Sequence, residues 1–208
     1  MMLFSNIKIK NYYSTTNSEN GCILRNINWI IRNNFDDIEI NTGYNILNEN
    51  KNIIDFIEYD NKKKLVEKYG EFNLDRLDSV YKPLNENDKN KIVILKNKTT
   101  KNRYIKVPVQ RYSANYENII LDKEEYSAME VIDVIYHFYN TKELTLSDLQ
   151  KLDEDDSWNY IKNAKELKTT NPMKKVHYIN IMGDCVFFEG LKCIEDSKNI
   201  EYSLMLGS

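Results

Sequence analysis

The chain has 208 residues, of which 41% are hydrophobic and 12% aromatic, and its formal net charge is −3. This size and composition fit one ordinary domain or two small ones, and they exclude a disordered chain without a core. The slight negative charge excludes bulk attraction to nucleic acid or to anionic lipid.

The residue usage points to the source and the compartment. About one residue in seven is Asn, while Ala, Gly and Pro are scarce against typical usage, a bias typical of an AT-rich genome. The cysteines Cys22, Cys185 and Cys193 have no CxxC spacing, which predicts reduced thiols in an intracellular protein. Since no apolar run resembles a signal peptide or a membrane span, we expect a soluble protein that is not secreted and has no membrane partner.

Residues 1–120 predict a strand-rich region with one helix. A short strand is expected at residues 3–9. The next apolar residues are spaced by one, three, three and one positions, which favours one face of a helix: Ile23, Leu24, Ile27, Ile30 and Ile31. Because most of them are β-branched, a strand is the alternative.

Two pairs of strands are expected in the rest of this region. The segment 53–70 predicts two strands around a polar turn at Asp60 and Asn61. Residues 92–95 and 104–109 predict a hairpin around a polar loop, and Pro108 suggests that its second strand lies at a sheet edge.

Residues 121–170 predict three helices. Ser127 and Glu130 have the spacing of a capping box, and a buried stripe follows through Val131, Ile132, Ile135, Phe138 and Tyr139.

Two shorter helices are expected after this one. Thr145 can cap the second helix, which carries Leu146, Leu149 and Leu152. The third helix is expected to begin at Asp155 or Asp156 and to end at Asn171-Pro172, with an inward face formed by Trp158, Ile161 and Leu167.

The C-terminal segment predicts strands at 176–182, 185–189 and 200–206, with a hairpin turn at Gly183 and Asp184. The predicted class is therefore α+β: an N-terminal strand-rich region with one helix, then a three-helix segment followed by an antiparallel β-meander. The predicted units are 1–120 and 121–208, which can also pack as one domain.

The sequence contains only weak indications of a metal site or a catalytic site. The acidic run 153–156 could hold magnesium or calcium, but it lacks the spacing of a calcium loop and better fits a helix start. His137 and His177, with Cys185 and Cys193, match no zinc motif and are interpreted as structural residues. No nucleophile elbow, phosphate loop or metalloprotease motif is present, so we predict no enzyme, no catalytic residue, no cofactor and no metal site.

Charge is distributed unevenly along the chain. Residues 89–111 contain eight basic residues and no acid, whereas residues 121–160 contain eleven acids and three bases. The basic hairpin could follow a phosphate backbone and stack a base, which makes nucleic acid a possible partner. The proposed contacts are Lys96, Lys98, Lys101, Arg103, Tyr104, Lys106 and Arg111. The alternative is a lysine-protected sheet edge that faces acids of the same chain or of a partner.

A winged helix is a further alternative, because three helices precede a predicted hairpin. Lys162, Lys165 and Lys168 would then face phosphate.

Three segments carry a resemblance: IYHFYNTKELTLSDL, LDEDDSWNYI, and YINIMGDCVFFEGL with the terminal LMLGS. Over about the last 80 residues the chain resembles uncharacterised proteins of giant, mimivirus-like large DNA viruses. This resemblance implies a viral protein in the host cytoplasm or the virion, and it implies no activity.

We therefore predict a viral, non-enzymatic protein that acts by protein–protein interaction, as a virion or host-interaction component. Phe187 and Phe188 would supply apolar area on both faces of one strand, which requires a protein partner or self-association to cover one of them. The alternative is a nucleic-acid-binding protein that uses the basic 89–111 hairpin, and a weaker alternative is a metal-dependent enzyme.

Overall fold

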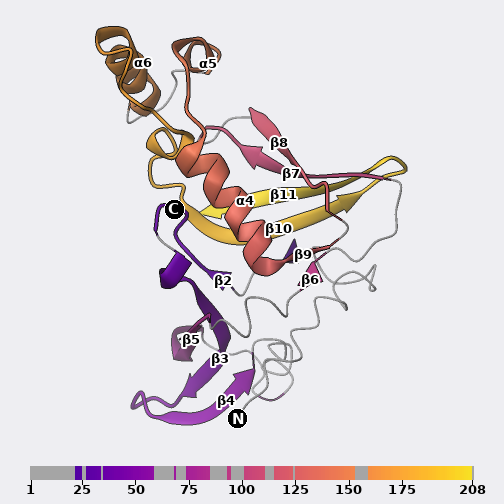
Figure 1. The fold of residues 1–208 in the computed structure, drawn as a ribbon. Helices are drawn as coiled ribbons and strands as arrows, with labels where there is room; N and C mark the ends of the chain where they lie inside the picture. The colour runs from indigo at the N-terminus through magenta and orange to yellow at the C-terminus, as the bar shows by residue number, and fades with distance from the viewer. Residues whose placement is uncertain are drawn as a thin grey trace.

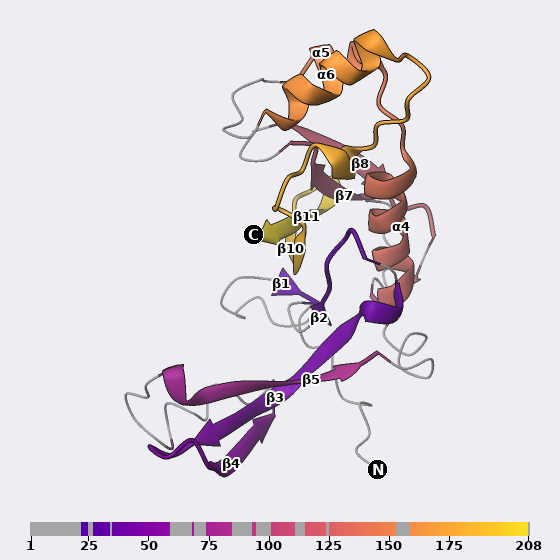
Figure 2. The same cartoon turned by 90° about the vertical axis from the view of Figure 1, so that its left-hand side faces the viewer.

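The computed structural model describes residues 22–24, 27–33, 35–58, 68, 74–84, 93–94, 101–110, 115–123, 125–152 and 159–207. Strands and helices are both present, which confirms the α+β class. A mixed sheet carries helix α4 on one face, and a second sheet extends away from it (Figure 1). The view from the side separates these two sheets clearly (Figure 2).

The main sheet has five strands in the order β1-β10-β11-β7-β8, which are Cys22–Ile23, Phe187–Glu195, Asn199–Gly207, Asn102–Pro108 and Tyr116–Ile120. Its neighbours are antiparallel except for β11 and β7, which run parallel. The C-terminal strands β10 and β11 pair antiparallel as predicted, but the sheet as a whole is mixed, because β11 also pairs in parallel with β7.

The second sheet is built around the long strand β3 and is antiparallel; its strands are β2 (Ile27–Asn28), β3 (Glu39–Leu47), β4 (Ile53–Glu58) and β5 (Leu77–Pro83). Strand β4 confirms the first strand expected in segment 53–70. Except for Lys68, the second expected strand and the turn at Asp60 and Asn61 lie outside the described residues.

Helix α4 (Ala128–Thr141) begins with the predicted capping box. The backbone N–H of Glu130 donates to Ser127 Oγ at 3.2 Å, and the N–H of Ser127 donates to the Glu130 carboxylate at 2.7 Å. All five residues of the predicted stripe are buried, and they join the sheet residues in one core. The helix therefore covers one face of the five-stranded sheet (Figure 2).

Helices α5 (Leu146–Gln150) and α6 (Tyr160–Thr170) follow. Thr145 caps α5 as predicted, and α6 ends before Asn171 as predicted. The N-cap of α6 is Asn159, which has a left-handed conformation, so the expected cap at Asp155 or Asp156, outside the described residues, is wrong.

The inward face predicted for the third helix is only partly correct. Ile161 is buried, but Leu167 is exposed, and Trp158 lies outside the described residues. The Lys168 side chain is buried and pairs with Glu143 at 2.8 Å, so it does not face a phosphate as a winged helix would require.

The helix expected between Ile23 and Ile31 is instead the short strands β1 and β2. Leu24 has a positive φ of 60°, which turns the chain between them. Ile23 pairs with Leu191 of β10, and Ile27 pairs with Ile40 of β3. Ile23 and Ile27 therefore lie in strands, as the alternative interpretation predicted, while Ile30 forms an isolated bridge with Phe187.

The strand expected at 176–182 is instead a 3-10 helix at Tyr178–Asn180. The Asn180 side chain accepts a hydrogen bond from the His177 backbone N–H at 2.8 Å, which favours a turn over an extended chain. Gly183 does lie in a turn, with φ of 62°, but β10 begins only at Phe187, so the predicted hairpin there is wrong.

The hairpin predicted at 92–109 does not form either. Strand β6 (Val93–Ile94) pairs with β9 (Tyr126–Ser127), whereas β7 lies between β11 and β8. Pro108 thus belongs to an interior strand rather than an edge. It lies beyond Lys106, the last residue of β7 that pairs with β11, so its missing N–H breaks no ladder there.

Candidate interaction surface on the five-stranded sheet

The five-stranded sheet has one covered face and one open face. On β7, Ile105 and Val107 are fully buried on the side of α4, while Tyr104 and Lys106 alternate to the opposite side. Strands β10, β11 and β8 have the same alternation. We call the surface opposite α4 the open face.

The strand register aligns open-face residues in rows across the four long strands. The first row consists of Ile194, Glu201, Tyr104 and Ile120. The second row consists of Lys192, Ser203, Lys106 and Asn118. Because opposite residues in a sheet share a face, each row is a continuous line of side chains.

The centre of the open face is polar and hydrogen-bonded. Glu201 accepts from the Tyr104 hydroxyl at 3.2 Å and from Ser203 Oγ at 2.6 Å, and Lys106 Nζ lies 3.7 Å from its carboxylate. Desolvation, followed by the hydrogen bond and the negative charge of Glu201, raises the pKa of Tyr104. The central carboxylate is therefore held by groups of its own chain.

The outer strands of the open face carry exposed apolar side chains. Ile120 is 68% exposed and Tyr116 49% on β8, while Ile194 is 46% exposed and Phe187 41% on β10. Lys106 Nζ lies 4.7 Å from the centre of the Tyr116 ring, a cation–π distance. Four large apolar groups thus flank a polar centre.

The residues proposed for nucleic acid are divided between the two faces. Lys101 pairs with Glu195, while Tyr104 and Lys106 lie on the open face beside Glu201. Arg103 is buried on the α4 side, where its guanidinium donates to the carbonyl of Lys123. Lys96, Lys98 and Arg111 lie outside the described residues.

The two phenylalanines proposed for interaction point to opposite faces, as expected of neighbours in a strand. Phe188 is buried, with its ring centre 6.1 Å from that of Trp29, and is a core residue. Phe187 alone is at the surface. Sequence reasoning missed Ile120, Tyr116 and Ile194, because nothing local indicates which side of a strand a helix covers.

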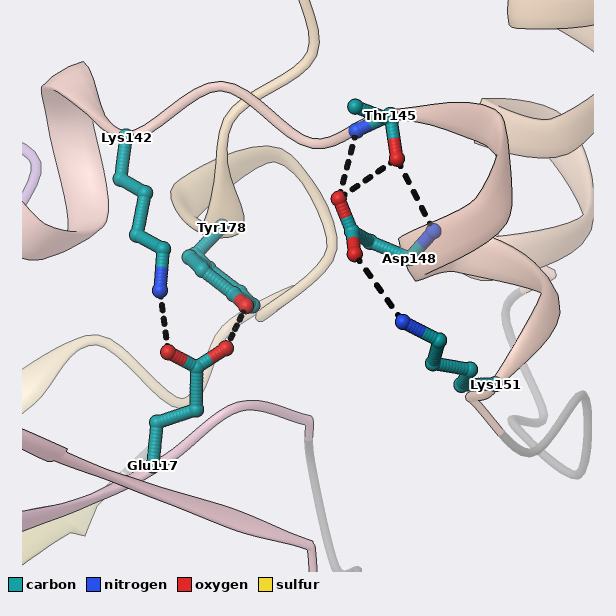
Figure 3. A network of polar contacts seen from close by, with 6 residues as sticks. All are labelled: Glu117, Lys142, Thr145, Asp148, Lys151 and Tyr178. Atoms are coloured by element: carbon teal, nitrogen blue, oxygen red, sulfur yellow. Dashed lines mark hydrogen bonds and ion pairs between the residues drawn. The ribbon is translucent and has the colours of Figure 1, made fainter.

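A second polar cluster lies on the covered side (Figure 3). Glu117 of β8 accepts a hydrogen bond from the Tyr178 hydroxyl and pairs with Lys142 at the end of α4. The Tyr178 ring stacks on Phe138 with ring centres 4.7 Å apart. Burial, and secondly the contact with Glu117, raises the pKa of Tyr178. A tyrosine held in its neutral form can donate a hydrogen bond that connects two elements, but it is a poor base for abstracting a proton.

The adjacent contacts in Figure 3 are a helix cap. Asp148 accepts from the backbone N–H of Thr145 at 3.1 Å and pairs with Lys151 at 3.4 Å. These residues secure the start of α5 and the connection after α4.

The stability of the fold should decrease above pH 10 because of Tyr178. The folded chain keeps its phenol neutral, whereas an unfolded tyrosine ionises at its ordinary pKa of 10.0. The contribution of Tyr178 to the free energy of unfolding is fully present below that pH. It decreases as pH rises further, by at most about 1.4 kcal/mol per pH unit for one tyrosine. Urea unfolding between pH 8 and 11 should show a shallower decrease in Tyr178→Phe; an identical slope would contradict the assignment.

Metal-binding chemistry has no support among the residues that the structure describes, where no group of three His, Cys, Asp or Glu side chains could hold an ion. His137 is exposed and its ring lies 3.2 Å from the Asp133 carboxylate one turn earlier in α4, so it is not part of the core. Burial, and secondly Glu195, raises the pKa of the Cys193 thiol to about 11, which disfavours the reactive thiolate. The acidic run 153–156 lies outside the described residues.

Comparison of the chain with protein-family models, with curated proteins and with solved structures finds no match. Within the described ranges, no helix has the length and apolar character needed to cross a lipid bilayer. The function is therefore inferred from the side chains of the sheet.

Proposed function

We propose that this is a non-enzymatic protein that acts by binding another protein through the open face of its five-stranded sheet. The observation that carries the proposal is the set of four exposed apolar side chains on this face: Ile120, Tyr116, Ile194 and Phe187. Covering one such side chain contributes about 1.5–3 kcal/mol, so a partner that covers several gains substantial affinity. The resemblance to giant-virus proteins supports a viral component that works in the host cytoplasm or the virion.

A protein partner is favoured over nucleic acid by the charges of this face. Phosphate binding gains its free energy when free cations displace counterions from the nucleic acid. On this face Lys106 instead lies beside Glu201, which a phosphate group would have to displace. Lys101 is also paired, with Glu195, whose register with Ile200 places it on the covered side. A polar centre with aromatic and aliphatic groups around it resembles the composition of protein interfaces.

Nucleic acid is the second candidate. The observation that favours it is Tyr116 and Tyr104 beside Lys106 on an open sheet, since exposed aromatic rings on a sheet can stack bases. A metal-dependent enzyme is a weaker candidate, because the acidic run 153–156 lacks the ligand spacing of a calcium loop.

Retention of partners on immobilised protein tests the proposal. A protein retained from infected-cell extract by the wild type should bind the Ile120→Glu variant at least about tenfold more weakly, because a charge replaces a group that the partner buries. Met173→Glu is the matched control, since Met173 is also an exposed apolar residue but lies after α6. The proposal is wrong if Ile120→Glu and Met173→Glu retain the same proteins equally.

A separate binding measurement tests the nucleic-acid alternative. Anisotropy of a labelled single-stranded oligonucleotide should then report binding that weakens with salt and in a Lys101→Glu, Lys106→Glu variant. Binding that is absent at low salt would remove this alternative.

A further inference from the structure

The residues of the open face are complementary to the same residues of a second copy that is related by a twofold rotation. Consider a twofold axis parallel to the strands and midway between β11 and β7. It places β10 of one copy against β8 of a second copy, and β11 against β7, while each residue stays in its own row. Packed sheets keep their strands within about 30° of each other and lie about 10 Å apart, which is compatible with this arrangement.

The first row is complementary under this rotation. Ile194, at one end of the row, meets Ile120 of the second copy, from the other end. Both side chains are exposed in the single chain, and the contact would bury both. Between them Glu201 meets Tyr104 of the second copy, so each Tyr104 hydroxyl, which donates to Glu201 of its own chain, also faces the carboxylate of the other copy.

The second row is complementary as well. Lys192 meets Asn118 of the second copy, and Ser203 meets Lys106. No two like charges of these rows lie directly opposite each other, because the rotation places both lysines of the second row against the neutral residues Asn118 and Ser203. Past the second row, Phe187 of β10 and Tyr116 of the second copy's β8 lie near each other at the same end of the face. This placement favours an aromatic contact.

The other in-plane twofold axis, perpendicular to the strands, fits poorly. Placed midway between the rows, it would make Ile194 face Lys192 and Ile120 face Asn118, so both isoleucines would be buried against polar groups. Placed on the first row, it would bring the Glu201 carboxylates of the two copies against each other, which is also unfavourable. The register therefore selects the axis parallel to the strands.

We infer that the partner of the open face is a second copy of this chain, packed face to face about the axis parallel to the strands. The inference rests on the proposed function, because it names the partner of the same surface. Four strands about 4.8 Å apart and about six residues long make a face of roughly 20 by 20 Å. A contact of this size belongs to the class below about 1,200 Å², so the dimer is reversible and depends on concentration.

Disulfide trapping tests the arrangement, since only this axis brings position 194 of one copy to position 120 of the other. Ile194→Cys and Ile120→Cys are prepared separately and oxidised mildly, alone and as an equal mixture. The mixture should yield a linked dimer several-fold above either variant alone. The wild type, with its native cysteines, measures the background. Equal linking in the mixture and in the single variants would overturn the arrangement.

Light scattering separates this inference from the proposed function. The wild type should approach twice its 24.7 kDa mass as concentration rises, and Ile120→Glu should stay monomeric while Met173→Glu dimerises normally. A dimer that persists in Ile120→Glu overturns the inference. If the wild type stays monomeric but Ile120→Glu still loses a retained protein, the inference fails and the proposed function stands. If no retained protein is lost either, both fail.

Discussion

Replacing Ile135 with alanine should lower the free energy of unfolding by about 2–5 kcal/mol. Ile135 is fully buried on the inward stripe of α4, in the core that the helix shares with the five-stranded sheet. The shortened side chain loses its transfer free energy and leaves a cavity that close-packed neighbours fill only partly. Urea unfolding followed by circular dichroism measures the change.

The matched control is Leu167→Ala, which removes a large apolar side chain from an exposed position of helix α6. Alanine has the higher helix propensity, so this change should cost within about 0.5 kcal/mol. Equal losses from the two variants would contradict the packing of α4 on the sheet. They would also remove the basis for calling the opposite face open.

Replacing Gly43 with alanine should cost about 1–3 kcal/mol, because β3 has no room for a side chain at this position. A Cβ there would lie 2.3 Å from the carbonyl oxygen of Ile57 and 2.5 Å from the Phe56 ring. The ring can move, but the carbonyl belongs to the backbone of the adjacent strand β4. The backbone conformation of Gly43, with φ of 158°, is a further reason to favour glycine.

Gly207→Ala provides the control for this second change. The three atoms nearest to its Cβ would all belong to the flexible side chain of Glu189, which can move away, so little stability should be lost. Hydrogen exchange should show faster opening of β3 and β4 in Gly43→Ala and unchanged rates there in Gly207→Ala. Unchanged exchange in both variants would mean that the second sheet tolerates a side chain at Gly43.

Local signals in the sequence predicted local structure well. The capping box of Ser127 and Glu130 forms as expected, and Thr145 caps α5. The helical stripe of α4 is buried throughout, and the last strand predicted at 200–206 is present as β11. In each case the partners lie within a few residues of one another, so spacing alone specifies the contact.

Errors arose where the partner is distant in the sequence. The spacing of Ile23 and its neighbours fits a helix face, but Ile23 pairs with Leu191, which no local pattern indicates. The strand at 104–109 was expected to pair with its neighbour at 92–95. It pairs instead with β8 and, in parallel, with β11, whose residue Glu201 lies opposite Tyr104.

The candidate surface shows the same division. The sequence by itself determined the α+β class, the N-caps of α4 and α5, the buried stripe of α4 and the basic character of residues 89–111, because these depend on composition and short spacing. Only the tertiary structure decided that α4 covers one side of the sheet, and that Glu195 and Glu201 lie beside Lys101 and Lys106. The rows of the open face depend on the register of four strands from two distant segments, and that register is set by long-range packing.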